Sequence, residues 1–166
     1  MRVRIALVVA ALLAVITAGG LSATAGSGNK FSATLTGYQE TPTLSVAGIG
    51  TFSAEIAKDG TSISYSLGYS GLSGDALFAH IHLGEPAIAG GVVAFLCGGG
   101  SKPACPAGTS GTVTGTIVAA DVIGPAGQGI DAGEFEELVA AMRFGATYAN
   151  VHTTLFPAGE IRGQIS

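Results

Sequence analysis

Apolar and polar residues alternate along most of the chain, and this period of two predicts β-strands. The alternation is clearest in residues 31–35, 52–56 and 63–69, where every second residue is apolar. Because successive side chains of a strand point to opposite faces of a sheet, each segment has one face for a core and one for water. Similar patterns predict further strands at residues 77–83, 92–96, 112–119, 148–156 and 160–165.

One segment follows a helical period instead. The apolar residues Phe135, Leu138, Val139 and Met142 recur at helical spacing before Gly145, and Asp131-Ala-Gly-Glu134 resembles a capping box. We therefore predict a helix over residues 132–144, with its apolar stripe packed on the sheet. The fold class that follows is all-β: an antiparallel, Greek-key-like β-sandwich with one short α-helix at about residues 132–144.

The amino terminus has the pattern of a secretory signal peptide. Arg2 and Arg4 precede an uncharged apolar run over residues 5–16, and small residues follow as far as Ala25. The run is about a dozen residues long, whereas a membrane-spanning helix needs about 20; a retained anchor is the alternative. We expect residues 1–25 to be a signal peptide and residues 26–166 to be one secreted domain, whether extracellular, periplasmic or on the cell surface, without a transmembrane anchor.

The charge of the chain and its cysteine content indicate which binding partners and which cellular compartment are plausible. The chain has a formal net charge of −4, and its basic residues are scattered, which argues against a nucleic-acid partner. An extracellular protein or an envelope component is the candidate partner, and nothing in the sequence indicates the oligomeric state. The only cysteines, Cys97 and Cys105, lie in a short glycine-rich run and should form a disulfide in an oxidising compartment. A thiol metal site is the alternative, but no histidine pair lies near them.

All three histidines lie in two predicted strands. His80 and His82 share one face of the first strand, and His152 shares a face of the second with Asn150. If these strands are neighbours, the three imidazoles converge, and neutral imidazole suits copper or zinc. The alternative is a hydrogen-bonded polar network that fixes the pairing of the strands.

The second of these strands ends in a predicted hairpin. Pro157-Ala158-Gly159 suits a three-residue turn, which would set His152 opposite Gln164 and Thr154 opposite Arg162. On this register polar residues meet on one face and apolar residues on the other. The polar network, or binding face, would then comprise Asn150, Glu160, Arg162 and Gln164, with Glu40 as a further candidate.

Four segments together resemble the CHRD domain, named from chordin. They are Phe-Ser-Ala-Thr-Leu-Thr-Gly-Tyr-Gln-Glu-Thr-Pro at residues 31–42, Ala-His-Ile-His-Leu-Gly at 79–84, Tyr-Ala-Asn-Val-His-Thr at 148–153 and Gly-Glu-Ile-Arg-Gly-Gln at 159–164. The resemblance covers about residues 30–165. It implies a secreted or surface-exposed β-sandwich-like domain of poorly defined molecular activity, which we interpret as a non-enzymatic extracellular binding or envelope-associated module.

Evidence for catalysis is weak. The His-x-His pair is faintly similar to copper/zinc superoxide dismutase, but that enzyme uses more histidines than the three in this chain, which argues against dismutase activity. No serine lies in a nucleophile elbow, and one carboxylate, Glu160, with one guanidinium, Arg162, is weak evidence for acid–base catalysis. We assign no catalytic residue. The two hypotheses are the binding module and a copper- or zinc-binding or redox protein that uses His80, His82 and His152.

Overall fold

The computed structural model describes residues 28–166, so the predicted signal peptide at residues 1–25 lies outside the described residues. In the described part the chain forms eight strands, one α-helix and three short 3-10 turns. The strands are β1 (Lys30–Thr36), β2 (Ile49–Ile56), β3 (Ile63–Ser70), β4 (Ala76–Leu83), β5 (Val92–Cys97), β6 (Gly111–Ile117), β7 (Thr147–Thr153) and β8 (Ile161–Gln164). The helix is α1 (Phe135–Phe144), and the turns are η1 (Gly37–Gln39), η2 (Ala119–Asp121) and η3 (Ala126–Gln128).

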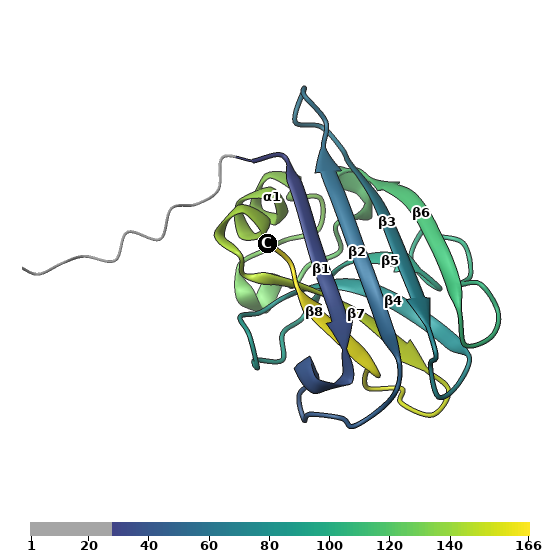
Figure 1. Cartoon of the computed structure of the whole chain (residues 1–166). Coiled ribbons are helices and arrows are strands. Elements are labelled where there is room, and N and C mark those ends of the chain that lie inside the picture. Colours follow the sequence, from purple (N-terminus) through teal and green to yellow (C-terminus); the bar gives the residue numbers. More distant parts are fainter. Residues whose placement is uncertain (1–27) are drawn as a thin grey trace, which may run out of the picture.

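All eight strands belong to one antiparallel sheet in the order β5-β4-β7-β8-β1-β2-β3-β6. The sheet folds over on itself, so that β1, β2, β3 and β6 form one layer and β8, β7, β4 and β5 form the other (Figure 1). The connections β3–β4, β5–β6 and β6–β7 pass between the layers, as in Greek-key folds. The predicted antiparallel sandwich with one helix is confirmed.

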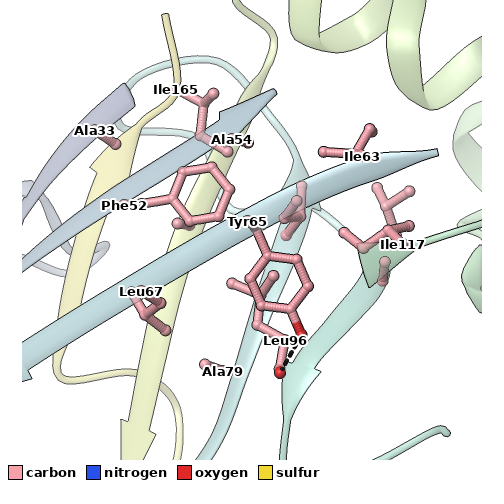
Figure 2. Packing of buried hydrophobic residues seen from close by; sticks show 14 of the residues in the cluster. Ala33, Phe52, Ala54, Ile63, Tyr65, Leu67, Ala79, Leu96, Ile117 and Ile165 are labelled. Atoms are coloured by element: carbon pink, nitrogen blue, oxygen red, sulfur yellow. Dashed lines mark hydrogen bonds between the residues drawn. The ribbon is translucent and has the colours of Figure 1, made fainter. Parts of the chain in front are cut away.

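The core lies between the two layers and is built by the predicted apolar faces. Phe52, Leu67 and Ile117 are buried there against residues of the opposite layer (Figure 2). The Tyr65 hydroxyl crosses the core and donates a 2.7 Å hydrogen bond to the carbonyl of Leu96. Burial raises the pKa of Tyr65 to about 12, so the hydroxyl keeps its proton and the bond joins β3 to β5 at ordinary pH.

The helix starts later than the sequence predicts. Its apolar stripe is buried as expected, but it begins at Phe135 rather than at residue 132. Gly133 has a φ of +90°, in the left-handed region, and a right-handed helix cannot pass through that conformation. The capping box is half formed, because the Glu134 carboxylate accepts a hydrogen bond from the Asp131 backbone while the Asp131 side chain caps nothing.

The predicted register of the β7–β8 hairpin is wrong. Gln164 lies opposite Tyr148 rather than His152, and Arg162 lies opposite Asn150 rather than Thr154. The ladder ends earlier because the hydroxyl of Thr153 accepts a hydrogen bond from the Phe156 backbone, which starts the turn before Pro157. The shift is an even number of residues, so each side chain of the two strands keeps its predicted face.

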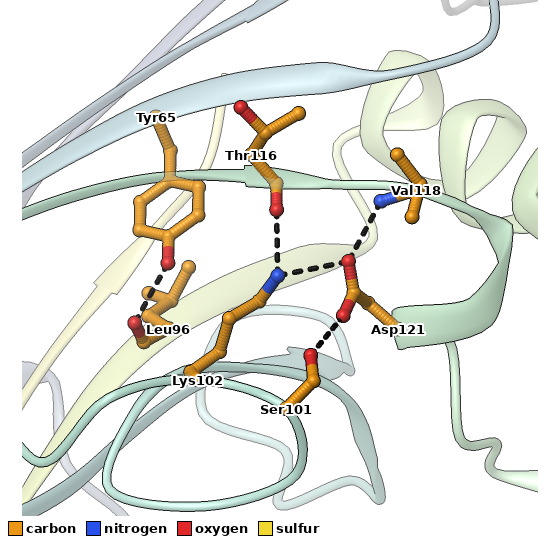
Figure 3. Close-up of polar contacts among 7 residues, drawn as sticks. All are labelled: Tyr65, Leu96, Ser101, Lys102, Thr116, Val118 and Asp121. Atoms are coloured by element: carbon orange, nitrogen blue, oxygen red, sulfur yellow. Dashed lines mark hydrogen bonds and ion pairs between the residues drawn. The ribbon is translucent and has the colours of Figure 1, made fainter.

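The expected disulfide between Cys97 and Cys105 is present and closes the loop after β5. A polar cluster fastens this loop to the opposite layer (Figure 3). The Lys102 ammonium lies 2.8 Å from the Asp121 carboxylate and donates to the Thr116 carbonyl, and Ser101 also donates to Asp121. The loop therefore bridges the two ends of the sheet, β5 and β6. Within residues 28–166 no helix has the length and apolar character needed to cross a membrane.

Candidate metal centre

Strands β4 and β7 are neighbours, which places the three histidines together. Their antiparallel register sets Phe78 opposite His152, His80 opposite Asn150 and His82 opposite Tyr148. The alternating residues Ala79, Ile81, Ala149 and Val151 are fully buried on the core side. The histidines therefore lie on the outer face of this layer, as the alternation predicts.

The three imidazoles converge on one point. The Nδ1 atom of His80 lies 3.1 Å from the Nε2 atom of His152, and one nitrogen from each histidine lies within 4.8 Å of the others. Nitrogens around a tetrahedral zinc ion, with bonds of about 2.0–2.1 Å, are separated by about 3.3–3.5 Å. Small side-chain rotations would bring this set to binding distance.

Backbone carbonyls fix the protons on two of the rings. The Nδ1 atom of His82 donates to the Gly90 carbonyl at 3.0 Å, and the Nδ1 atom of His152 donates to the Pro157 carbonyl at 2.9 Å. In a neutral ring this leaves Nε2 without a proton, and the Nε2 atom of His152 accepts the hydrogen bond from the Nδ1 atom of His80. The Nε2 atom of His82 is buried without a hydrogen-bond partner. A ring held by a carbonyl through one nitrogen, with the other nitrogen free, is the usual arrangement of a metal-ligating histidine.

Burial also keeps the rings neutral. The side chains of His80, His82 and His152 are only 6%, 8% and 9% exposed. Burial and the neighbouring imidazoles lower the pKa of His80 to about 3, burial lowers that of His82 to about 4, and burial lowers the pKa of His152. The rings are therefore neutral at neutral pH, and a bound metal would replace the hydrogen bond between His80 and His152.

Aromatic side chains surround the imidazoles. The ring of Phe95 from β5 packs edge-on against His80 at 4.4 Å between centroids. The ring of Tyr148 stacks on His82 at 4.8 Å with a tilt of only 5°. Phe78, at the rim, lies 6.0 Å from His80 and is partly exposed. The site is thus apolar on its sides and closest to solvent near Phe78.

Loops cover the rest of this face and carry the predicted polar residues. The Glu40 carboxylate, just after η1, accepts a hydrogen bond from the Asn150 amide, and burial raises the pKa of Glu40 to about 7. The Arg162 guanidinium lies 3.5 Å above the Tyr148 ring and donates to the Glu85 carbonyl at 2.8 Å. The Gln164 amide donates to the carbonyls of Gly84 and Gly145. Glu40 and Asn150 thus bind each other, whereas Arg162 and Gln164 bind loop atoms separately, all on the polar face beside the histidines.

Glu160 does not belong to this polar face, contrary to the sequence prediction. It precedes β8, and its carboxylate accepts hydrogen bonds from the Thr153 hydroxyl at 2.7 Å and from the Ser73 backbone at 2.6 Å. Thr153 belongs to the face of β7 opposite to that of His152. Glu160 therefore joins the end of β7 to the β3–β4 connection and takes no part in the histidine cluster.

Sequence reasoning missed the groups that orient the site. The carbonyls of Gly90 and Pro157 belong to loops, and no side-chain pattern reports the direction of a loop carbonyl. Phe95 is in a predicted strand, and it lies against His80 because β4 pairs with β5. The alternation of apolar residues within β5 does not predict which strand is its partner.

A comparison with protein-family models matches residues 31–165 to the CHRD domain. The chain belongs to the CHRD-domain family. The match spans all eight strands and the helix, so this CHRD domain is the whole of the described fold. Neither the curated proteins nor the solved structures contain a match.

Proposed function

We propose that this CHRD domain is a secreted, non-enzymatic binding module that holds one copper or zinc ion through His80, His82 and His152. The observation that carries the proposal is the convergence of three buried, neutral imidazoles, two of which are oriented by backbone carbonyls. The Nε2 atom of His82 is buried without a hydrogen-bond partner, as are the Asn150 Oδ1 and Gln164 Oε1 atoms, and of these three only the imidazole nitrogen lies in the histidine cluster.

The proposal predicts about one retained copper or zinc ion per chain. Protein without affinity-tag histidines would be stripped with chelator, exposed to either ion, dialysed exhaustively and subjected to elemental analysis. His80→Ala and His152→Ala should each lower the affinity by roughly a hundredfold or more, because two imidazoles make an incomplete set for these ions.

Two controls separate loss of ligand from loss of fold. Phe95→Leu removes a ring that touches His80 but no ligand atom, and it should retain the ion. His80→Phe keeps a ring in place without a ligating nitrogen, and it should fold but not retain the ion. Failure of the wild-type protein to retain either ion would reject metal binding and leave the histidines as a sheet-fixing network.

The secreted location is supported by the amino-terminal pattern and by the disulfide, which persists in oxidising compartments. Expression of the full chain in a secreting bacterial host should release a mature protein that begins at Gly26, as intact-mass measurement and amino-terminal sequencing would show. Recovery of the uncleaved chain in the membrane fraction would contradict this part of the proposal.

A further inference from the structure

This inference rests on the proposed metal site and concerns which ion it takes. We propose that the site selects monovalent copper, Cu(I), over Cu(II) and Zn(II), and that the positive charge of Arg162 sets this preference. Three features of the site favour Cu(I): the charge of the ligands, the position of Arg162 and the apolar surroundings.

The ligands of the proposed site carry no negative charge. In the part of the chain that the structure describes, the only group of side chains placed to hold a metal consists of the three histidines. Both cysteines are in the disulfide, and the Glu40 carboxylate hydrogen-bonds to Asn150 and is not part of the metal-ligand group. A bound ion would therefore keep its full charge. Because the cost of burying an ion rises steeply with its charge, a buried neutral site favours the monovalent ion.

The guanidinium of Arg162 lies close to the ligands. Arg162 lies over the Tyr148 ring at 3.5 Å, and that ring stacks on His82 at 4.8 Å, so the three groups form a column. Arg162 is 2% exposed, and its hydrogen bonds go to the uncharged Glu85 carbonyl and Thr41 hydroxyl. Within residues 28–166 the only ion pair joins Lys102 to Asp121. The charge of Arg162 therefore repels a divalent ion more than a monovalent one.

Glu40 offsets this repulsion only in part. Its carboxylate interacts with the charge of Arg162, but burial raises the pKa of Glu40 to about 7, so near neutral pH the negative charge is only partly present. Glu40→Gln should therefore strengthen the preference for Cu(I), whereas loss of the Arg162 charge should weaken it.

The surroundings of the three histidines are apolar. Phe95 and Tyr148 pack against the imidazoles, and the three histidines are nearly buried. In such surroundings charge interactions are weakly screened by solvent. Three neutral nitrogen donors also complete the trigonal coordination that Cu(I) accepts, whereas Cu(II) favours tetragonal sites with more ligands.

The test compares the affinities of the stripped protein for Cu(I), Cu(II) and Zn(II). Cu(I) would be titrated without oxygen against bicinchoninate as competitor, and the divalent ions against chelators of known affinity. Cu(I) should bind more tightly than Cu(II), so that the reduction potential of the bound copper lies above that of aqueous copper. Zn(II) should bind more weakly than Cu(I) by roughly a hundredfold or more.

Variants of Arg162 test the cause. In Arg162→Gln the ratio of Cu(I) affinity to Cu(II) affinity should fall by roughly tenfold, because one nearby positive charge is lost. Arg162→Lys keeps the charge and should restore most of the ratio. If Arg162→Gln does not fold, Glu40→Gln tests the same charge effect with the opposite sign.

The outcomes separate the two proposals. Retention of no ion in any state rejects the metal site and this inference with it. Retention of Cu(II) or Zn(II) as tightly as Cu(I) leaves the metal site in place and overturns the selectivity. A Cu(I) preference that is unchanged in Arg162→Gln or Glu40→Gln overturns the role of the Arg162 charge.

Discussion

Replacing Ile81 by aspartate is expected to lower the free energy of unfolding by about 4 kcal/mol or more. Ile81 is fully buried on the core side of β4, opposite Ala149 of β7 and Ala94 of β5. A carboxylate at this position would be surrounded by apolar side chains with no cation to pair with, and the packing of the isoleucine would also be lost. Urea unfolding followed by circular dichroism measures the effect.

The matched control is Ile49→Asp. It makes the same chemical change in a strand, β2, but Ile49 is 56% exposed, so the aspartate remains in water. The expected cost is at most about 1 kcal/mol, from the low β-propensity of aspartate. Equal costs at the two positions would show that the face of β4 that carries Ile81 is not the core face, and the outward placement of His80 and His82 would fail with it.

The strands were predictable because each one carries its own signal. In β2 and β3 every second residue is apolar, which predicts the face of each strand that packs in the core. The buried residues of both strands confirm this prediction. The helix was predictable from its stripe, but its start was not. Gly133 adopts a left-handed conformation that prevents the helix from starting before it, and a glycine in a capping-box pattern does not reveal that conformation.

The histidine face was predictable, but the cluster was not. Alternation places His80 and His82 on one side of β4, yet their meeting with His152 depends on the pairing of β4 with β7, which are far apart in the sequence. The hairpin register depended on a side-chain bond within the turn, from Phe156 to Thr153. Glu160 was misplaced because its carboxylate binds Thr153 and the Ser73 backbone, although its own backbone still donates to the Val151 carbonyl of β7. Pairing and turn length are tertiary properties that no local pattern contains.

Acidification from about pH 6.5 toward pH 4 is expected to destabilise the metal-free protein by several kcal/mol. In the unfolded chain the histidines bind protons near pH 6.5. In the folded protein burial lowers the pKa of His80 to about 3 and that of His82 to about 4, and it lowers the pKa of His152 as well. Below pH 6.5 the unfolded state therefore binds more protons than the folded state, and stability falls with pH until the folded rings protonate.

The titration of Glu40 changes the stability in the opposite direction, so its effect must be distinguished from that of the histidines. Burial raises the pKa of Glu40 to about 7, so the folded state binds a proton on Glu40 at a higher pH than the unfolded state does. This difference adds stability as the pH falls from 7 toward 4.5. Three histidines outweigh one carboxyl group, so the net effect remains a loss. Glu40→Gln should make the loss steeper, and His80→Phe should make it shallower.

Urea unfolding of these three proteins at several pH values between 7 and 4.5 measures the effect. Equal stability of the wild-type protein at pH 7 and pH 5 would contradict it. The burial of the three imidazoles both disfavours their protonation and keeps them neutral for a metal, so loss of one histidine should reduce acid sensitivity and metal retention together. His80→Phe should therefore make the pH profile shallower and also retain no ion, whereas Phe95→Leu should leave both properties unchanged.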